Sequence, residues 1–276
     1  MRVALIQLNA SDDPEANLPQ TLALMDEAVL SGADIIMTPE VTNCVSGSRS
    51  RQAAVLSDEA NDRTLYALRS QAAAFKIWVL IGSLALKGGS EGRFVNRSFL
   101  IDPTGRIVAR YDKIHMFDVT LSEKEQYLES AGYAPGTDVV THSVGNAVLG
   151  MTICYDLRFP HLYRRLAQSG ATVLTVPSAF AKITGEAHWE TLLRARAIEN
   201  GAFVLAPAQC GTHEAAEGKR PRQTHGHSLV IDPWGKILAD GGDMPGVTTV
   251  DLDLSTVETS RKRIPSLTHD RSFEGP

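Results

Sequence analysis

Residues 147–176, AVLGMTICYDLRFPHLYRRLAQSGATVLTV, decide the fold class of this chain. They begin with an apolar run, 147–153, that is typical of a buried strand. Apolar residues at helical spacing follow, and Gly170 supplies a helix stop before a second apolar run at 171–176. A strand, a helix and a further strand in this order predict a layered α/β fold.

The same order of elements occurs in both halves of the chain. Each half gives a strand, a helical stretch, a strand, a second helical stretch, a strand and a hairpin. The two hairpins turn at Asp-Pro-x-Gly, at 102–105 and at 232–235, which is a strong turn signal. This repetition predicts a single pseudo-symmetric domain over residues 1–276, with sheets inside and helices outside.

The composition gives no reason to expect a nucleic-acid or membrane partner. The chain has 276 residues, with 27 Lys and Arg against 32 Asp and Glu, and a formal net charge of -5. A mildly acidic chain has no electrostatic attraction to nucleic acid or to an anionic membrane. The dense basic run at 219–222 is interpreted as a solvated loop, and the apolar run at 2–8 is too short to span a membrane.

The cysteines favour a reducing compartment. Cys44, Cys154 and Cys210 are an odd and sparse set, which is not a disulfide framework. We therefore expect a soluble, cytoplasmic protein.

Three reactive side chains follow predicted strands. Glu40, Lys113 and Cys154 each stand just after an apolar run. In α/β folds functional groups gather at the carboxyl ends of strands, so these three side chains are candidates for one site. Together they offer a base, a cation and a nucleophile.

Cys154 is the centre of the predicted chemistry. It stands between a buried strand and a helix whose expected N-cap is Asp156, so the helix dipole would favour the thiolate. The backbone N–H of Tyr155 would donate to an oxyanion formed at an attacked carbonyl. The alternative is a buried cysteine acting as a small hydrophobe, which Cys44 and Cys210 fit better.

Glu40 and Lys113 have structural alternatives of their own. A glutamate after a buried strand can act as a general base with a pKa raised by partial desolvation, or it can be a surface carboxylate. A lysine after a strand can stabilise a negative tetrahedral intermediate, or it can be an exposed strand-end cation.

Three segments resemble the signature regions of the nitrilase superfamily of carbon–nitrogen hydrolases. They are Pro39-Glu40, YDKIH at 111–115 and CYDLRFP at 154–160. The resemblance continues through 185–190, 194–200, 226–228 and 232–235, and so spans nearly the whole chain. It implies a four-layer α-β-β-α sandwich with an internal pseudo-two-fold repeat. It also implies a hydrolase that needs no metal or organic cofactor and forms a homodimer or a higher homo-oligomer.

The resemblance also assigns roles to residues. It makes Cys154 the nucleophile, Glu40 the general base and Lys113 the electrostatic stabiliser. The family has a second glutamate that orients the lysine, and Glu129 matches it best, with Glu123 and Glu125 nearby.

Within the family, the chain is similar to the branch that contains deaminated-glutathione amidase and ω-amidase, and closer to the former. This similarity implies hydrolysis of the amide bond of a small carboxylate-bearing substrate through a thioester. Action on α-ketoglutaramate, on nitriles or on N-carbamoyl compounds stays open, because the triad is shared. The resemblance also implies that residues 255–276 form a C-terminal helix and a tail that packs on a partner subunit.

Several side chains are candidates for substrate binding. Arg158 lies four positions after Cys154 and would pair with a substrate carboxylate, or else form a structural salt bridge with Glu199 or Asp156. The other candidates are mostly aromatic, and each has plain core packing as its alternative. They are Phe117, Tyr155, Ser178, Phe180 and Trp189.

Two alternatives lie outside this chemistry. A metallohydrolase would use His213, His225 and His227, but alternate residues of a strand point to opposite faces and no ligand set has metal-site spacing. A catalytically inactive binding protein of the same fold is the other alternative, although all three candidate catalytic residues are present.

A chelator separates the first of these alternatives from a cysteine hydrolase. We expect amide hydrolysis to persist after prolonged dialysis against EDTA, because no step of a thiol mechanism needs a metal. Activity that is lost on dialysis and restored by zinc would favour the metallohydrolase.

Overall fold

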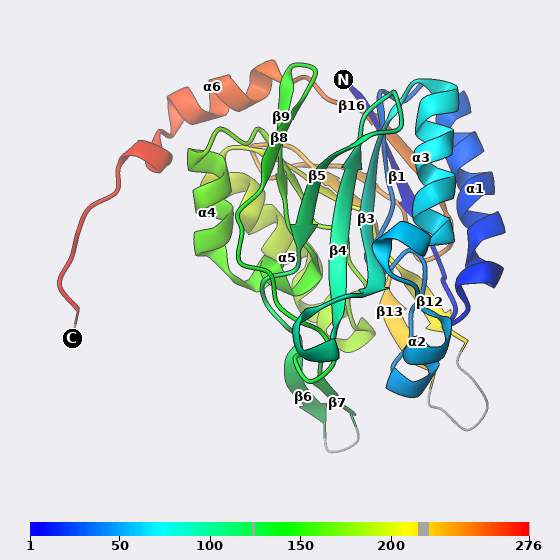
Figure 1. Ribbon diagram of the computed structural model, residues 1–276. Helices are drawn as coiled ribbons and strands as arrows, with labels where there is room; N and C mark the ends of the chain where they lie inside the picture. The colour runs from blue at the N-terminus through cyan, green and yellow to red at the C-terminus, as the bar shows by residue number, and fades with distance from the viewer. Residues whose placement is uncertain (123–124, 215–220, 276) are drawn as a thin grey trace.

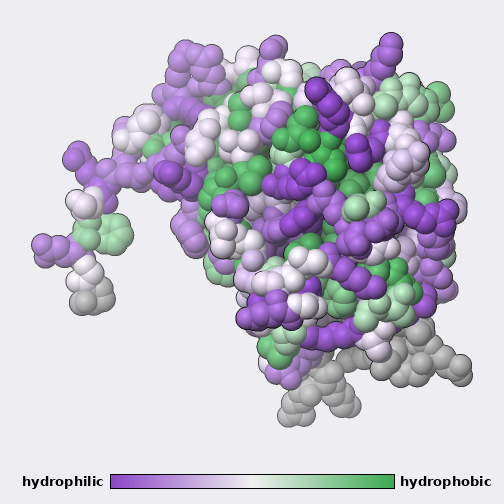
Figure 2. Space-filling view, viewed as in Figure 1, coloured by the Kyte–Doolittle hydropathy of each residue, from purple (hydrophilic) through white to green (hydrophobic). Residues whose placement is uncertain are grey.

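The protein is built from two six-stranded sheets that face each other, with helices on the outer faces (Figure 1). This computed structural model describes residues 1–122, 125–214 and 221–275. The α-β-β-α layering expected from the sequence is confirmed. Figure 2 shows hydrophilic and hydrophobic side chains interspersed over the face seen in Figure 1.

The first sheet has the strand order β16-β1-β2-β3-β4-β5. Strands β1, β2 and β3 are mutually parallel, and β16, β4 and β5 are antiparallel to their neighbours. The strands span Gly246–Asp251 (β16), Arg2–Gln7 (β1), Ile35–Met37 (β2), Trp78–Lys87 (β3), Phe94–Ile101 (β4) and Ile107–Asp112 (β5).

The second sheet has the order β8-β9-β10-β11-β14-β15, read from the corresponding edge. Strands β9, β10 and β11 are parallel, and the flanking strands are antiparallel. The strands span Thr141–Val144 (β8), Ala147–Met151 (β9), Val173–Thr175 (β10), Phe203–Ala206 (β11), Leu229–Ile231 (β14) and Ile237–Asp240 (β15).

The two sheets therefore repeat each other strand for strand, as the sequence repeat predicts. The two hairpin turns also match, since Gly105 donates its N–H to Asp102 O at 2.8 Å and Gly235 donates to Asp232 O at 3.0 Å. The outer strands cross over between the halves. β8 follows the first half along the chain but joins the second sheet, and β16 follows the second half but joins the first sheet.

Two pairs of helices cover the sheets. Helices α1 (Pro14–Leu30) and α3 (Arg63–Phe75) pack on the first sheet, and α4 (Pro160–Gln168) and α5 (Lys182–Asn200) pack on the second. The chain sets these boundaries locally. For example, the Asp62 carboxylate caps α3 by accepting from Leu65 N at 2.8 Å.

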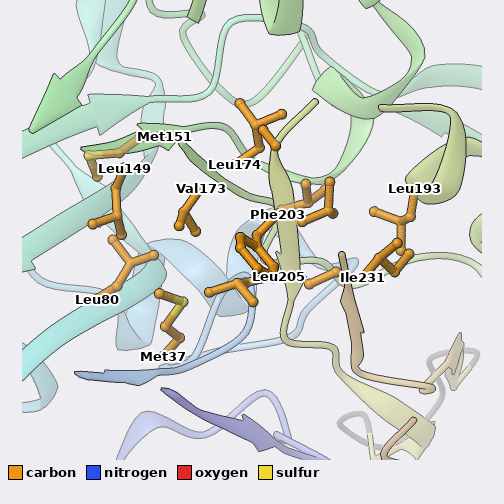
Figure 3. Packing of buried hydrophobic residues seen from close by; sticks show 14 of the residues in the cluster. Met37, Leu80, Leu149, Met151, Val173, Leu174, Leu193, Phe203, Leu205 and Ile231 are labelled. Atoms are coloured by element: carbon orange, nitrogen blue, oxygen red, sulfur yellow. The ribbon is translucent and has the colours of Figure 1, made fainter. Parts of the chain in front are cut away.

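The largest apolar layer lies between the sheets and under α4 and α5. Figure 3 shows Met37 and Leu80 of the first sheet lying against Leu149 and Leu205 of the second. These side chains are fully buried. A separate apolar layer fills the space between the first sheet and helices α1 and α3.

Shorter elements gather at one end of the sandwich, the lower end in Figure 1. They are α2 (Arg49–Val55), the hairpin β6 (Asp118–Ser122) to β7 (Glu125–Leu128), and the hairpin β12 (Cys210–His213) to β13 (Arg222–His225).

The 3-10 helices span Glu59–Asn61 (η1), Ser90–Gly92 (η2), Cys154–Arg158 (η3) and Ser266–Thr268 (η4).

The C-terminal segment is a helix and an extended tail. Helix α6 spans Ser255–Arg263, and η4 packs on the chain's own α4, where Arg164 Nη2 donates to Ser266 O at 2.8 Å. Phe273, farther along the tail, is 91% exposed. Packing of this tail on a partner subunit stays a prediction, as does the single domain. Within the described chain, no helix has the length and apolar character needed to span a membrane.

One local expectation is wrong. An α-helix was expected directly after Cys154 with Asp156 as its N-cap, but a 3-10 turn, η3, lies there and α4 begins only at Pro160. The physical reason is that proline lacks an N–H and its fixed φ suits the first turn of a helix. The Asp156 carboxylate is engaged elsewhere, as described below.

The inter-sheet layer generates a stability prediction. Leu205→Ala removes a fully buried side chain and should lower the free energy of unfolding by about 2–5 kcal/mol. The matched control is Leu30→Ala at the end of α1, which is 88% exposed and should change that free energy by less than about 0.5 kcal/mol. Urea denaturation followed by circular dichroism measures both. Equal effects would contradict the assigned core.

Candidate active site

Backbone ladders carry the three candidate residues beyond the ends of their strands. Lys113 N donates to Asn96 O at 3.0 Å, which extends the β4–β5 pairing by one step. Cys154 N donates to Pro177 O at 3.0 Å beyond the β9–β10 pairing. Glu40 follows β2 in a tight turn that Ser83 closes by donating its N–H to Pro39 O at 3.2 Å. The two facing sheets thus present these side chains at one end of the sandwich.

A buried ion-pair network lies at the centre of the site. Lys113 Nζ is 2.9 Å from Glu40 Oε1, and it lies 3.0 Å and 2.9 Å from the two carboxylate oxygens of Glu129. Lys113 is 2% exposed and Glu40 is 3% exposed. Glu129 Oε2 also accepts from Phe117 N at 2.6 Å. One ammonium is therefore clamped between two carboxylates that come from different parts of the chain.

Glu40 has a donor at each oxygen. Asn96 Nδ2 donates to its Oε1 at 2.9 Å, and Ala179 N donates to its Oε2 at 2.8 Å. The Cys154 thiol donates a hydrogen bond to the same carboxylate. This carboxylate therefore contacts both the cation and the sulfur, with its orientation fixed by two further donors.

Cys154 has an unusual backbone conformation. Its φ is +47°, in the left-handed region that non-glycine residues rarely adopt, and the side chain is 6% exposed. Such a φ costs roughly 1–3 kcal/mol, which the surrounding hydrogen bonds must offset. The turn directs the chain into η3, whose first N–H groups, including that of Tyr155, have no acceptor inside the helix.

Asp156 ties the cysteine turn to the lysine segment. Its Oδ2 accepts from Ile153 N at 2.9 Å and from the Tyr111 hydroxyl at 2.6 Å. Its Oδ1 accepts from His115 N at 3.0 Å. Asp156 is fully buried, joins the residues that flank Cys154 and Lys113, and is the N3 residue of η3 instead of the N-cap of an α-helix.

The protonation pattern differs from the expectation in two respects. Burial works to raise the pKa of Glu40, but the Lys113 ammonium, the Arg222 charge and the hydrogen bond from Cys154 together outweigh burial and hold the pKa below its usual range. Burial and the Glu40 carboxylate together raise the pKa of the Cys154 thiol. The predicted raised Glu40 pKa and the predicted resting thiolate are therefore both wrong. At neutral pH the site holds a neutral thiol beside an ionised carboxylate.

Lys113 stays charged in this environment. Burial works to lower its pKa, but the carboxylates of Glu129 and Glu40 outweigh burial and hold the pKa well above its usual range. The remaining thiols are also neutral at rest, since burial raises the pKa of Cys44 to about 12 and that of Cys210 to about 11.

A glycine allows the two halves to approach closely at the site. A Cβ built on Gly82 of β3 would overlap Thr38 O, and it would lie 2.6 Å from Pro39 O and 2.5 Å from Pro177 Cβ. These neighbours belong to the turns that hold Glu40 and Cys154. Any larger residue at position 82 must therefore displace one of the two turns.

These residues open into a cavity of about 730 Å³. Glu40, Lys113, Glu129 and Cys154 line it, and the lining includes parts of α2, β7, β12 and β13. Three of the aromatic side chains predicted from the sequence also line it: Phe117, Tyr155 and Phe180.

Three other predicted substrate-binding residues are not among the described residues that line the cavity. Ser178 is fully buried and donates its hydroxyl to Val176 O at 3.0 Å. Trp189 packs on Phe180 with ring centroids 5.0 Å apart. The Arg158 guanidinium lies over the rings of Tyr155 and Phe180, at 5.9 Å and 5.4 Å from their centroids.

The predicted salt bridges of Arg158 are not formed within the described chain. Its Nη2 is 3.3 Å from His188 Nδ1 instead. Glu199 pairs with Arg196. Among the glutamates proposed to support Lys113, the contacts favour Glu129. Glu123 lies outside the described residues, and the structure describes only the backbone of Glu125.

Sequence reasoning missed several lining residues. Arg222, interpreted as part of a solvated loop, is the first residue of β13 and lines the cavity. Asn96 of β4 contacts Glu40, and Arg49 and Tyr133 also line the cavity. No motif marked these positions, although the period-2 pattern of a strand does put Asn96 on the inner face when its neighbours are known.

The three histidines of the metal alternative do not converge. His213 is buried between Ala10 O and the Thr224 hydroxyl. The rings of His225 and His227 stack with centroids 4.7 Å apart, contrary to the expected opposite faces, because His225 ends β13 and the chain turns at Gly226. Within the described chain, no group of three or more His, Cys, Asp or Glu side chains could hold a metal ion.

This arrangement supplies what attack on a poor electrophile needs. A thiol lies against an ionised carboxylate that can take its proton, and a permanent cation lies next to that carboxylate. The cation and nearby backbone N–H groups can stabilise negative charge on an attacked carbonyl oxygen.

Comparisons with known proteins agree with this chemistry. Residues 2–262 match the carbon–nitrogen hydrolase family. The deaminated glutathione amidase of Synechocystis sp. is 39% identical over 271 residues, which cover 96% of this chain and 96% of that protein.

Two solved structures are similar over nearly the whole chain. Nit3 of Saccharomyces cerevisiae, a member of branch 10 of the nitrilase superfamily, has a TM-score of 0.86 at 28% identity, covering 99% of this chain and 97% of that chain. A glutamate-to-glutamine variant of an amidase from Nesterenkonia has a TM-score of 0.77 at 29% identity, covering 96% of this chain and 98% of that chain. In that variant, acrylamide has added to the active-site cysteine.

The close approach at Gly82 generates a prediction. Gly82→Ala should lower the free energy of unfolding by about 1–3 kcal/mol, because the new methyl group overlaps backbone. The matched control is Gly246→Ala on β16, where nothing lies within 4 Å of the added Cβ, and its effect should stay under about 0.5 kcal/mol. Thermal and urea denaturation measure both variants. If Gly82→Ala has the same free energy of unfolding as the wild type, the two turns can move apart enough to accommodate the methyl group.

Proposed function

The chain belongs to the carbon–nitrogen hydrolase family, and on this premise we propose that it hydrolyses the amide bond of a small carboxylate-bearing molecule through a thioester on Cys154. It is a hydrolase that acts on carbon–nitrogen bonds other than peptide bonds. The observation that carries the proposal is that one buried carboxylate, Glu40, contacts both the Cys154 thiol and the Lys113 ammonium.

In the acylation step, Cys154 attacks the amide carbonyl while Glu40 accepts the thiol proton. The thiol is neutral at rest, so proton transfer must accompany attack, and the hydrogen bond to Glu40 puts the base in position. Glu40 then delivers the proton to the departing nitrogen, and the C–N bond breaks to leave a thioester.

The tetrahedral intermediate carries negative charge on oxygen. Lys113 and the Tyr155 N–H are the proposed stabilising groups. Glu129 is proposed to position Lys113, since it contacts the ammonium through both of its oxygens. In the deacylation step, water that gives its proton to Glu40 attacks the thioester and releases the acid and the thiol.

Deaminated glutathione is the proposed substrate. Relatives named deaminated glutathione amidase, at 39% identity over nearly the full length of both chains, support this choice. The alternatives are α-ketoglutaramate, a nitrile and an N-carbamoyl compound, and a hydrolysis panel separates them. The alternative from another class, an inactive binding protein, predicts no turnover of any of them.

The proposed location is the cytoplasm, which the three buried cysteines, all with free thiols, support. The homodimer implied by the resemblance stays a prediction. Sedimentation at several concentrations tests it.

The nucleophile is tested by a substitution. Cys154→Ala should lower kcat for deaminated glutathione by at least about 10³-fold, because no other group can form the thioester. The control is Cys210→Ala, a buried cysteine that is not among the described residues lining the cavity, which should retain turnover within about twofold. Turnover that persists in Cys154→Ala would refute the mechanism.

The role of Glu40 is tested by the pH dependence of alkylation. The carboxylate raises the pKa of Cys154, so Glu40→Gln should move the midpoint of Cys154 alkylation to lower pH. The same variant should lose about 10²–10⁴-fold in amide turnover, because the base is gone. Iodoacetamide labelling with peptide mass spectrometry gives the midpoint, and Glu190→Gln on the exposed face of α5 is the control. A midpoint that stays in place or rises would contradict the assigned contact.

A further inference from the structure

The charges that line the cavity are unevenly distributed. Four cationic and three carboxylate side chains line it, namely Arg49, Lys113, Lys182 and Arg222 against Glu40, Glu129 and Glu214. The group around Lys113 uses both Glu40 and Glu129 and carries a net negative charge. The remaining lining charges have a net positive sum. A negatively charged part of a substrate is therefore repelled by the group around Lys113 and attracted to the wall that carries the other cations.

Arg222 is the least exposed cation on that wall. Arg49 and Lys182 are exposed, whereas Arg222 is half-buried at the start of β13. Charge interactions are stronger where water is partly excluded, so Arg222 should dominate the attraction. The Arg222 charge lowers the pKa of both Glu40 and Cys154, so Arg222 is close enough to the reacting groups to influence them.

The guanidinium is held in place from two sides. Nη2 donates to Ala179 O at 2.6 Å, and the Tyr127 ring centroid lies 5.5 Å from Cζ. Ala179 in turn donates its N–H to Glu40 Oε2. Ala179 therefore lies between Arg222 and the proposed base, Glu40. This arrangement fixes the distance between the Arg222 guanidinium and the reacting end of the site.

Two buried polar atoms of residues that line this cavity have no hydrogen-bond partner within the described chain. They are Arg222 Nε, a donor, and Asn96 Oδ1, an acceptor beside Glu40. A buried donor without an acceptor is costly, so such atoms often mark places that a ligand completes.

We propose that Arg222 is a specificity-determining residue that binds the substrate carboxylate, so that the enzyme prefers monoamides of dicarboxylic acids over neutral amides of equal length. The inference rests on the amidase function proposed above. The fork of N–H donors on arginine suits a carboxylate, which a lysine at this position would match less well. Arg222 takes the role that the sequence suggests for Arg158, whose guanidinium lies over the Tyr155 and Phe180 rings.

The test compares two amides that differ only at the distal group. Succinamate carries a carboxylate where butyramide carries a methyl group. We expect Arg222→Gln to lower kcat/KM for succinamate, mainly through KM, by about 10- to 100-fold more than it lowers kcat/KM for butyramide. The matched control is Arg158→Gln, which should leave the ratio of the two kcat/KM values unchanged.

Binding gives a readout that does not depend on turnover. Calorimetry with the Cys154→Ala protein should detect succinamate, and the added Arg222→Gln change should weaken that binding by a similar factor. Wild type that hydrolyses neither these amides nor deaminated glutathione would contradict the proposed function, while this binding comparison would still test Arg222.

Three results would overturn the assignment. One is an equal loss for both amides in Arg222→Gln, which indicates a structural role. Another is loss of the preference in Arg158→Gln instead. If Arg222→Gln does not fold by circular dichroism, Arg222→Lys replaces it. The lysine variant should lose part of the succinamate preference. A fully retained preference in that variant is the third result that would overturn the assignment.

Discussion

The buried contact between Lys113 and Glu40 is the interaction on which the rest of the site depends. Removing one partner of a buried ion pair leaves an uncompensated charge and typically costs about 3–5 kcal/mol. Glu129 supplies the second carboxylate, so the ammonium stays protonated and the network stays charged. That permanent cation keeps Glu40 ionised beside a neutral thiol, which is the state that general-base chemistry requires.

The sandwich makes this network possible because its two sheets bring strand ends from both halves together. Glu40 and Lys113 come from the first sheet and Cys154 from the second, and Gly82 lets the turns that hold Glu40 and Cys154 approach closely. The crossing outer strands, β8 and β16, link the halves further, because each half supplies an edge of the other's sheet. The packing between the sheets therefore also fixes the positions of the reacting groups at the sheet ends.

Much of the architecture could be predicted because it follows local periodicity. The repeated order of strands and helices and the two Asp-Pro-x-Gly turns gave the layers and the repeat. The errors arose where long-range contacts decide. Asp156 has the side chain of an N-cap, yet it binds Tyr111 and His115 from another part of the chain. The pKa of Glu40 depends on Lys113, which no local pattern places beside it.

Periodicity and motif order suffice to predict the α/β layering, the reactive residue types and the family that they resemble. Long-range packing, in contrast, brings Glu129 into contact with Lys113, keeps the Cys154 thiol neutral and makes Arg222, and not Arg158, line the cavity. The physical reason is that charge interactions and desolvation depend on distances across the fold. Residues far apart in sequence, such as Ala179 and Glu40, acquire those distances only when the sheets pack.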